Sequence, residues 1–406
     1  MNIKKIIKSN SITAGIAYKA REKRTQKLMD KYSRDTIDSN KIFFYRSGGG
    51  YGDNPKAIAE YLHKNYPNIE LVWGYVASNH LESFPEYVKP VLFQSEECFK
   101  EMSTASVWVC STTLPFGTQK KESQLYIQTW HGDKFLKKIA NDAAAEVEEY
   151  KKRTVNRKFC EEFICDYYVT GCDWFVPIAS SALGYNGAFL RTGMPRNDCL
   201  INKDLEKIKV IKQKLGISDN CKILIYAPTF RDYMKSHDQI GSNIDLVKIV
   251  DELEKKDNTD WICLLRAHDG KLLTLNGNSI NDKRFMDVTV YPDIADLLQI
   301  SDMLISDYSS CAADFALTGK FVLMYQDDFE TYTTKGRTLY ISPDESPYFT
   351  AYNMEEALDI ISNVDAEKAK NNCKEILEFY HSYENGNACI KVCDVIIKHI
   401  ESLKRK

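Results

Sequence analysis

Short apolar segments alternate with amphipathic ones along this chain, and the pattern occurs twice, once on each side of a turn-rich break at residues 193–198. Strands that alternate with helices at this spacing are typical of parallel sheets with helices on both faces. A chain of 406 residues is also too long for one compact core, so we expect two α/β domains. The predicted strands are 42–45, 71–76, 107–110, 125–129, 167–169, 189–191, 222–226, 261–265, 288–291, 303–306 and 321–325.

The residues between these strands predict the helices and the domain boundaries. Asp53 or Asn54 is expected to cap a helix that has Pro55 in its first turn. A charged helix is predicted at 142–159, and other helices at about 243–256, 293–301, 309–318 and 387–403. The expected parts are a basic N-terminal segment (1–38), a first domain (39–198), a second domain (199–385) and a C-terminal helix that packs back across the domains (386–406).

Composition and charge exclude several classes of protein. A net charge of -3 argues against a dedicated nucleic-acid binder, which is usually strongly basic. The apolar stretches are strand-sized and the N-terminus has no apolar signal core, so we expect neither a transmembrane helix nor a signal peptide. The twelve cysteines include no CxxC pair and are interpreted as structural thiols.

The N-terminal segment, residues 1–38, is rich in lysine and arginine with isoleucines scattered among them. Such a basic amphipathic segment is typical of a helix that lies on anionic lipid, which would place the protein on the inner membrane surface. A solvated helix packed on the first domain explains the pattern equally well. The same two interpretations apply to the charged residues at 142–159, which could also face a polyanionic acceptor.

Two histidines each come directly after a predicted strand, one in each half of the chain. His131 comes after the strand at 125–129, and His268 comes after the strand at 261–265. Parallel sheets present their ligand-binding residues at the carboxyl ends of the strands, so we expect a cleft between the domains where chemistry occurs. A histidine there suits a general base that deprotonates a hydroxyl acceptor. The alternative for His131 alone is a structural histidine.

The second half also carries groups suited to a diphosphate. Ser306–Ser310 ends a strand and opens a helix, so backbone N–H groups and hydroxyls would face an anion. Thr229 and Arg231 can donate to phosphate, and Arg266 and His268 would enter the same region from the next strand. The alternatives are plain helix capping by the serines and a surface salt bridge for Arg231.

No metal or cofactor is expected. The other histidines and the carboxylates show no metal-ligand spacing, and Arg, His and a helix terminus can offset diphosphate charge. The glycine-rich loop at 48–52 can approach phosphate or acceptor, but it lacks both the GxGxxG spacing and the lysine of a P-loop.

Six motifs, in order over about residues 40–345, resemble those of the CDP-glycerol glycerophosphotransferases of bacterial teichoic-acid synthesis. Each motif alone is modest, whereas six in the same order are very specific. They are Gly52–Lys56, Trp130–Gly132 with Leu136–Ile139, Gly193–Asp198, Tyr226–Asp232, Arg266–His268, and Ser306–Ser310 with Asp314 and Phe315.

The resemblance implies a GT-B-like pair of Rossmann-type domains, attached peripherally to the cytoplasmic face of the membrane. It implies transfer of glycerol phosphate from CDP-glycerol to a hydroxyl of a lipid-linked saccharide or growing polymer, with release of CMP. The catalytic residues would be His131 and His268. The donor would be bound by Thr229, Arg231, Arg266, His268, Asp307, Ser309 and Ser310, and the acceptor by Gly50, Asn54, Trp130, Asp133 and Lys134.

Two departures from the family pattern leave alternatives open. The family commonly has Thr-Pro after the Trp-His-Gly motif, where this chain has Asp133 and Lys134, and Pro where this chain has Asp269. A CDP-ribitol donor, a nucleotide-sugar glycosyltransferase and a non-catalytic membrane-surface protein therefore stay as alternatives. The product, wall polymer or capsule, and a homo-oligomeric state are also left open.

Overall fold

The computed structural model describes residues 11–46, 48–147, 150–151, 159–229, 231, 233, 243–267 and 282–405, without the side chains of 11–15, 79 and 80. The chain forms two compact units. Unit 1 comprises the residues up to Asp133, Lys151–Asp198 and those from Tyr383 onward, and unit 2 comprises Lys134–Tyr150 and Cys199–Ser382.

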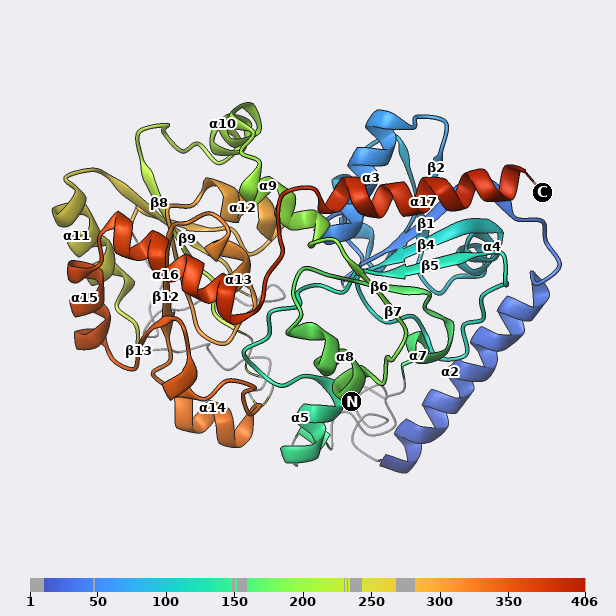
Figure 1. Ribbon diagram of the computed structural model, residues 1–406, viewed down its shortest axis with the longest axis horizontal. Helices are drawn as coiled ribbons and strands as arrows, with labels where there is room; N and C mark the ends of the chain where they lie inside the picture. Colours follow the sequence, from blue (N-terminus) through green and yellow to red (C-terminus); the bar gives the residue numbers. More distant parts are fainter. Residues whose placement is uncertain are drawn as a thin grey trace. The chain divides into compact units, whose positions relative to one another are not determined.

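Unit 1 is built on a seven-stranded parallel sheet with the order β3-β2-β1-β4-β5-β6-β7 (Figure 1). The order reverses between β1 and β4, which creates the switch point where open α/β sheets bind ligands. The strands are β1 (Asp38–Tyr45), β2 (Glu70–Tyr75), β3 (Val88–Leu92), β4 (Ala105–Cys110), β5 (Leu125–Gln128), β6 (Tyr167–Thr170) and β7 (Ala188–Arg191). The helices are α2 (Ser11–Lys31), α3 (Asp53–Asn65), η1 (Ser78–Ser83), α4 (Glu96–Thr104), α7 (Glu161–Ile164), α8 (Phe175–Leu183), η2 (Pro195–Asn197) and α17 (Ala388–Lys404).

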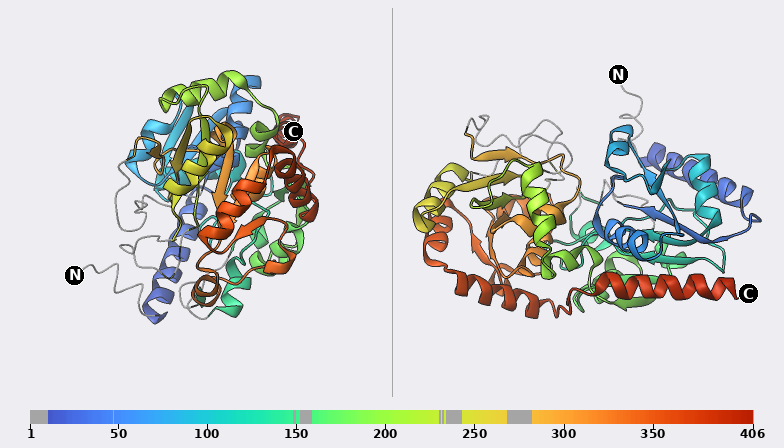
Figure 2. Two further views of the ribbon diagram at one scale, coloured as in Figure 1. Left: turned by 90° about the vertical axis from the view of Figure 1, so that its left-hand side faces the viewer. Right: turned by 90° about the horizontal axis from the view of Figure 1, so that it is seen from above.

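Strand β1, in the interior of the unit 1 sheet, is buried on both faces at its carboxyl end. Ile42 and Phe44 belong to one core cluster, and Phe43 and Tyr45 belong to the other, as the two-residue period of a strand requires. The first cluster is covered by α3 and α17, which lie side by side (Figures 1 and 2). Asp198 fixes the start of α17, because its carboxylate accepts hydrogen bonds from the backbone N–H groups at the first turn of that helix.

Unit 2 contains a six-stranded parallel sheet with the order β10-β9-β8-β11-β12-β13, and its switch point lies between β8 and β11. The strands are β8 (Lys222–Tyr226), β9 (Trp261–Leu265), β10 (Phe285–Asp287), β11 (Met303–Ser306), β12 (Phe321–Tyr325) and β13 (Phe349–Ala351). The helices are α5 (Ala140–Glu146), α9 (Asp198–Ile201, starting at the unit boundary), α10 (Leu205–Lys214), α11 (Leu246–Asp257), α12 (Ile294–Ile300), α13 (Cys311–Ala316), α14 (Phe329–Lys335), η3 (Pro343–Glu345), α15 (Met354–Asn363) and α16 (Ala366–Phe379).

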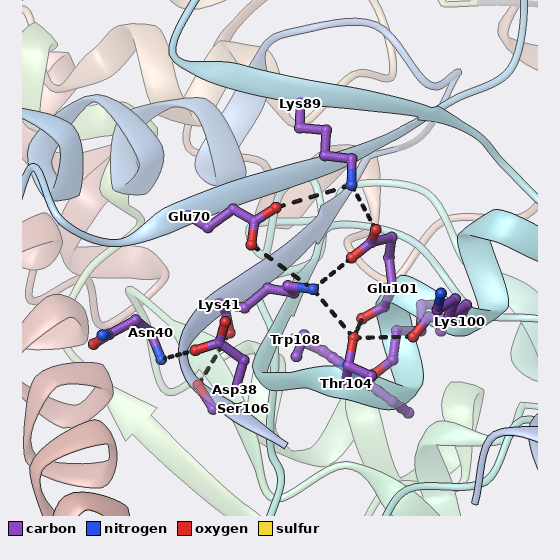
Figure 3. Close-up of polar contacts among 12 residues, drawn as sticks. Asp38, Asn40, Lys41, Glu70, Lys89, Lys100, Glu101, Thr104, Ser106 and Trp108 are labelled. Atoms are coloured by element: carbon purple, nitrogen blue, oxygen red, sulfur yellow. Dashed lines mark hydrogen bonds and ion pairs between the residues drawn. The ribbon is translucent and has the colours of Figure 1, made fainter. Parts of the chain in front are cut away.

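A charged cluster lies near the amino ends of β1, β2 and β3, away from the switch point (Figure 3). Glu101 of α4 accepts hydrogen bonds from Lys41 at 2.7 Å and from Lys89 at 2.6 Å, and Glu70 lies within 4 Å of both lysines. Burial opposes ionisation of Glu101, but the two lysines outweigh it and lower its pKa. Ion pairs in this cluster therefore join α4 to β1, β2 and β3, and each carboxylate lies beside two lysines.

The sheets correct the strand prediction at three edges. β3, with Pro90 in its middle, and β13, with three residues, were not predicted; both are edge strands, where a missing ladder hydrogen bond is tolerated. The strand predicted at 288–291 is wrong, because β10 ends at Asp287, where its partner β9 ends at Leu265. Val290, whose β-branched side chain favoured the prediction, is 89% exposed.

The predicted capping of α3 is also wrong. Gly52 is the N-cap residue, no side chain caps the helix, and Asp53 has a φ of 65°. Asn54 is fully buried and uses its amide for contacts with other segments.

Residues 134–150 belong to unit 2, although we expected them in the first domain. Lys138 N donates to Thr338 O at 2.8 Å, and the Tyr340 hydroxyl donates to Asp142 at 2.7 Å, so segments distant in sequence hold this stretch. Of the helix predicted at 142–159, the structure describes α5 and residues 150 and 151, and residues 148, 149 and 152–158 lie outside the described part. None of the described helices is both long and apolar enough to cross a membrane.

Candidate active site

His131 comes after β5 and lies beside the segment after β4. Its Nδ1 is 2.8 Å from the carbonyl oxygen of Ser111, the first residue after β4. Because a carbonyl oxygen can only accept, Nδ1 carries a proton in this contact, and in the neutral imidazole the lone pair is then on Nε2. The imidazole is exposed and stacks on the ring of Trp130, with ring centroids 4.6 Å apart. Unit 1 thus holds a histidine in the tautomer that a general base needs.

The backbone before His131 is held on both sides by buried amides. Trp130 has a φ of 51°, a left-handed conformation that costs a non-glycine residue about 1–3 kcal/mol. Gln128 accepts from Trp130 N at 2.9 Å and donates to Thr112 O at 3.0 Å, and Asn54 donates to Trp130 O at 3.1 Å. These hydrogen bonds impose the unfavourable conformation and join the segments after β4 and β5.

Gln128 was missed by sequence reasoning. It is fully buried in a strand that otherwise reads as an ordinary apolar run. A buried amide must find partners, so a glutamine at the last position of a core strand was the available signal. The predicted acceptor residue Asn54 shares its positioning role: its amide oxygen accepts from Arg196 N at 3.0 Å, and Arg196 also pairs with Asp53 at 2.8 Å.

Two polar atoms around His131 are buried without a hydrogen-bond partner among the described residues, the Oγ of Ser111 and the Nε1 of Trp130. Buried polar atoms are rarely left unsatisfied, so these two call for an explanation such as a catalytic role or a bound water. The predicted acceptor residue Gly50 is buried in the loop after β1. In that loop Gly49 has a φ of 79°, and a Cβ there would meet Val76 N at 2.6 Å, so only glycine fits.

The remaining predicted acceptor residues, Asp133 and Lys134, are both fully buried. The Asp133 carboxylate accepts from Gly171 N at 2.5 Å and from the Thr170 hydroxyl at 3.1 Å. Asp133 therefore anchors the segment after His131 to the end of β6. The structure does not bring either side chain to an exposed position beside His131.

Unit 2 places a buried ion cluster at its switch point. The Arg231 guanidinium donates to Asp307 at 2.7 Å and to Thr229 O at 2.6 Å, and it meets Asp328 through two nitrogens at 2.7 and 3.0 Å. Asp307 also accepts from Thr229 N at 2.8 Å, so the backbone at Thr229 is held at both N and O. The stacked rings of Tyr308 and Tyr332 lie about 5 Å from the guanidinium carbon. The surface salt bridge considered for Arg231 is wrong, because this cluster is buried.

Charge pairing decides the protonation states in this cluster. Burial alone would raise the pKa of Asp307, but Arg231 and hydrogen bonds from Thr229 and Tyr308 outweigh it and lower that pKa. Burial likewise opposes the charge of Arg231, and Asp307 and Asp328 raise its pKa. The cluster is a charged network at neutral pH. Asp328, which comes after β12, was missed because it lies about 100 residues from Arg231 in sequence.

The other predicted donor residues have different surroundings. The Thr229 hydroxyl is buried without a partner among the described residues. Ser309 and Ser310 are half-buried at the start of α13, and Ser310 makes no side-chain cap. Arg266 donates to the carbonyl oxygens of Val288 and Tyr291 at 3.0 and 2.6 Å, which orders the loop after β10. His268 lies outside the described residues.

The structure thus assembles two groups of predicted residues, each at the switch point of its own sheet. Trp130, His131 and Asn54 come together in unit 1, and Thr229, Arg231 and Asp307 come together in unit 2. In the described part of the chain, no three His, Cys, Asp or Glu side chains are placed to hold a metal ion.

The sequence matches the family described as CDP-Glycerol:Poly(glycerophosphate) glycerophosphotransferase over residues 28–398. The chain belongs to this family. The resemblance seen in the six motifs is therefore confirmed.

Members of the glycerophosphotransferase family with assigned names are similar over most of the chain. The teichoic acid poly(glycerol phosphate) polymerase of Staphylococcus epidermidis is 31% identical over 94% of this chain and 54% of its own length. That of Bacillus subtilis is 31% identical over 88% and 48%. The chain thus spans about half the length of these two relatives. The teichoic acid glycerol-phosphate transferase of Staphylococcus aureus is 31% identical over 92% of this chain and 96% of its own.

A solved structure of a histidine-to-alanine variant of the wall teichoic acid polymerase TagF has the same fold. It superposes with a TM-score of 0.79 at 29% identity, over 99% of this chain and 100% of that chain. The predicted fold class, two Rossmann-type α/β domains of the GT-B-like kind with parallel sheets, is confirmed.

Proposed function

We propose that this protein transfers glycerol phosphate from CDP-glycerol to a hydroxyl of a lipid-linked saccharide or teichoic-acid-like polymer and releases CMP. The observation that carries the proposal is the Nδ1 of His131 on the Ser111 carbonyl, which leaves Nε2 as the basic nitrogen. The names of the family and its relatives support the donor and acceptor classes. A histidine-to-asparagine variant of TagF was also solved after a soak with CDPG.

The transfer begins with the acceptor. His131 Nε2 takes the proton of the acceptor hydroxyl, and the hydroxyl oxygen attacks the β-phosphorus of CDP-glycerol in line. The bond from that phosphorus to the bridging oxygen breaks, and CMP leaves with the electron pair. As His131 becomes positively charged, its Nδ1–H bond to the Ser111 carbonyl strengthens and keeps the ring in place.

Unit 2 supplies the donor site. The Thr229 hydroxyl, Ser309, Ser310 and the backbone N–H groups that open α13 donate to the diphosphate, together with Arg266 and His268. Arg231 and Asp307 act through Thr229, whose backbone they fix.

Unit 1 supplies the acceptor site beside His131. Gly50, Trp130 and the unpaired hydroxyl of Ser111 contact the acceptor. Asn54 and Asp133 position this surface from within the unit, and Lys134, the next residue in the chain and the first of unit 2, is fully buried.

The protein would meet a lipid-linked acceptor at the cytoplasmic face of the membrane, bound peripherally. The support is α2, a single 21-residue helix in which Lys19, Arg21, Lys23, Arg24 and Lys27 are all exposed. Exposed cations on one helix attract anionic lipid.

The test is CMP release from the purified protein, offered CDP-glycerol, CDP-ribitol or a UDP-sugar, each with a membrane lipid extract. We expect CMP from CDP-glycerol. CMP from CDP-ribitol alone would keep the reaction and change the donor. Turnover of a UDP-sugar alone would overturn the reaction, since attack would then fall on an anomeric carbon.

A further inference from the structure

Unit 1 contains a cavity of about 280 Å³ between α2 and the segments after β1, β3 and β4. Small-molecule sites usually measure about 300–1,000 Å³, so this cavity suits one sugar or polyol unit and is too small for a nucleoside diphosphate. Its walls mix aromatic rings with guanidinium and hydroxyl groups. They include Tyr18, Arg21, Thr25, Tyr45, Phe93 and Phe116.

Three polar groups in these walls have no partner among the described residues. Thr25 is 4% exposed and Tyr45 is 8% exposed, yet neither hydroxyl makes a hydrogen bond there. In the same described part, the guanidinium of Arg21 pairs with no carboxylate, although Glu22 is next to it in the chain. Neither hydroxyl oxygen is among the fully buried unpaired atoms, so both are open to solvent and can donate to a ligand in the cavity.

The cavity is also held in shape. Both terminal nitrogens of Arg24 donate to the carbonyl oxygen of Gln94 at 3.1 Å, and Gln94 has a φ of 63°. The ring of Phe93 stacks on Tyr45 with centroids 3.5 Å apart. A fixed aromatic wall suits the C–H faces of a sugar or polyol, and an arginine suits a phosphate.

The cavity borders the chain segment that orients His131. Ser111 N donates to Tyr45 O at 2.9 Å, and Ser111 O accepts from His131. Thr113, two residues after Ser111, lines the cavity, and two residues span at most about 7 Å. One glycerol phosphate repeat covers a similar length, so a chain whose terminal hydroxyl meets His131 would bring its preceding phosphodiester to the cavity.

We propose that this cavity binds the glycerol phosphodiester unit that precedes the reacting hydroxyl of the acceptor, with Arg21 on the phosphate and Thr25 and Tyr45 on the glycerol oxygens. The proposal deepens the acceptor assignment and rests on the proposed function. The same chemistry occurs in the headgroup of phosphatidylglycerol, and the position beside the His131 segment favours the polymer.

The first test is a calorimetric titration of the full chain with a three-repeat oligo(glycerol phosphate), without donor. We expect Arg21→Gln to weaken binding about tenfold, as loss of a charged hydrogen bond does, and Thr25→Val to weaken it a few-fold. Lys23→Gln is the control, since Lys23 is exposed on the same helix outside the cavity. Equal affinity of Arg21→Gln and the unmodified protein, or an equal loss in the control, would overturn the proposal.

Two further experiments separate a polymer ligand from a lipid ligand, and the cavity proposal from the proposed function. Phosphatidylglycerol vesicles should bind Arg21→Gln and Lys23→Gln equally, and a vesicle-specific loss in Arg21→Gln, with normal oligomer affinity, would make this a lipid site and overturn the proposal. In turnover assays the Arg21 variant should raise KM for the oligomer and leave kcat and the KM for CDP-glycerol within about twofold. If no variant releases CMP, the proposed function fails while the titration still decides the cavity.

Discussion

The two sheets share the same kind of strand order, but the polar groups at their carboxyl ends differ. In unit 1, His131 is exposed and the polar atoms of Ser111 and Trp130 lack partners among the described residues. In unit 2, Arg231 is enclosed by two carboxylates, and the unpaired hydroxyl beside it belongs to Thr229. The groups in unit 1 are therefore available for a reaction. Those in unit 2 instead fix the backbone at Thr229, against which a ligand can bind.

The difference arises from the segments that leave the strands at each switch point. In unit 1 the residues after β4 and β5 are joined by neutral amides and carbonyls, through Gln128 and Asn54. In unit 2 the residues after β8, β11 and β12 are joined by full charges. A buried charge network is stable only while complete, so a substitution at His131 should act on activity and one at Arg231 on stability.

The largest effect is expected at His131. His131→Ala should lower kcat by about 10²–10⁴-fold, which is what general-base catalysis contributes, and should leave the affinity for CDP-glycerol within a few-fold. The measurement is steady-state CMP release with a thermal melt of the same sample. His63, which stacks on Tyr87 away from this site, offers the matched control His63→Ala. Turnover equal to that of the unmodified protein would remove His131 from the base role.

Arg231 should show the reverse pattern, a large effect on stability. Arg231→Met leaves Asp307 and Asp328 buried without a cation, and breaking a buried pair costs about 3–5 kcal/mol of unfolding free energy. Urea unfolding of the purified variant measures this loss. Arg284 also meets three carboxylates, but it is 27% exposed, so Arg284→Met should cost about 1 kcal/mol or less. Similar losses in both variants would contradict the special role of burial.

A substitution at Thr229 tests whether its hydroxyl, which lies beside the buried ion cluster of unit 2, binds the donor. Thr229→Val removes the unpaired hydroxyl and keeps the backbone bonds to Asp307 and Arg231, so the free protein should be as stable as before. If the hydroxyl donates to the donor phosphate, KM for CDP-glycerol should rise about tenfold. Ser306→Ala is the control, because that hydroxyl already donates to Ala227 O and its loss should affect stability alone. An unchanged KM would exclude Thr229 from the donor site.

The sequence predicts which residues lie in the two sites better than it predicts the hydrogen bonds and ion pairs that hold them. Strand and helix alternation predicts the central strands, since apolar β-prone runs must be buried, and strand ends then locate His131 and Thr229. The partners Gln128 and Asp328 escape prediction because their roles depend on which strands are neighbours. Asn54 was assigned to a helix cap from local pattern alone, but tertiary hydrogen bonds to Trp130 and Arg196 outweigh that local preference.

The smallest effect is expected at Glu161, a buried carboxylate in unit 1. Glu161 is 1% exposed and accepts from Leu114 N at 2.7 Å and the Tyr126 hydroxyl at 3.0 Å, with no cation beside it in the described part of unit 1. Burial therefore raises the pKa of Glu161, whereas Arg231 lowers that of Asp307.

The raised pKa of Glu161 sets the sign of the pH dependence. The folded state binds the proton of Glu161 more tightly than the unfolded chain does, so this group contributes stability at low pH. That contribution is lost as pH rises from the unfolded pKa, about 4.3, through the folded one. Glu161→Gln keeps the acceptor for Leu114 and Tyr126 and removes the titration. Its unfolding free energy should lie close to the unmodified value at about pH 4, where Glu161 is protonated, and should gain on it as the pH rises above the unfolded pKa. Parallel pH profiles in urea unfolding would show that Glu161 has a charge partner, and the contrast with Asp307 would then disappear.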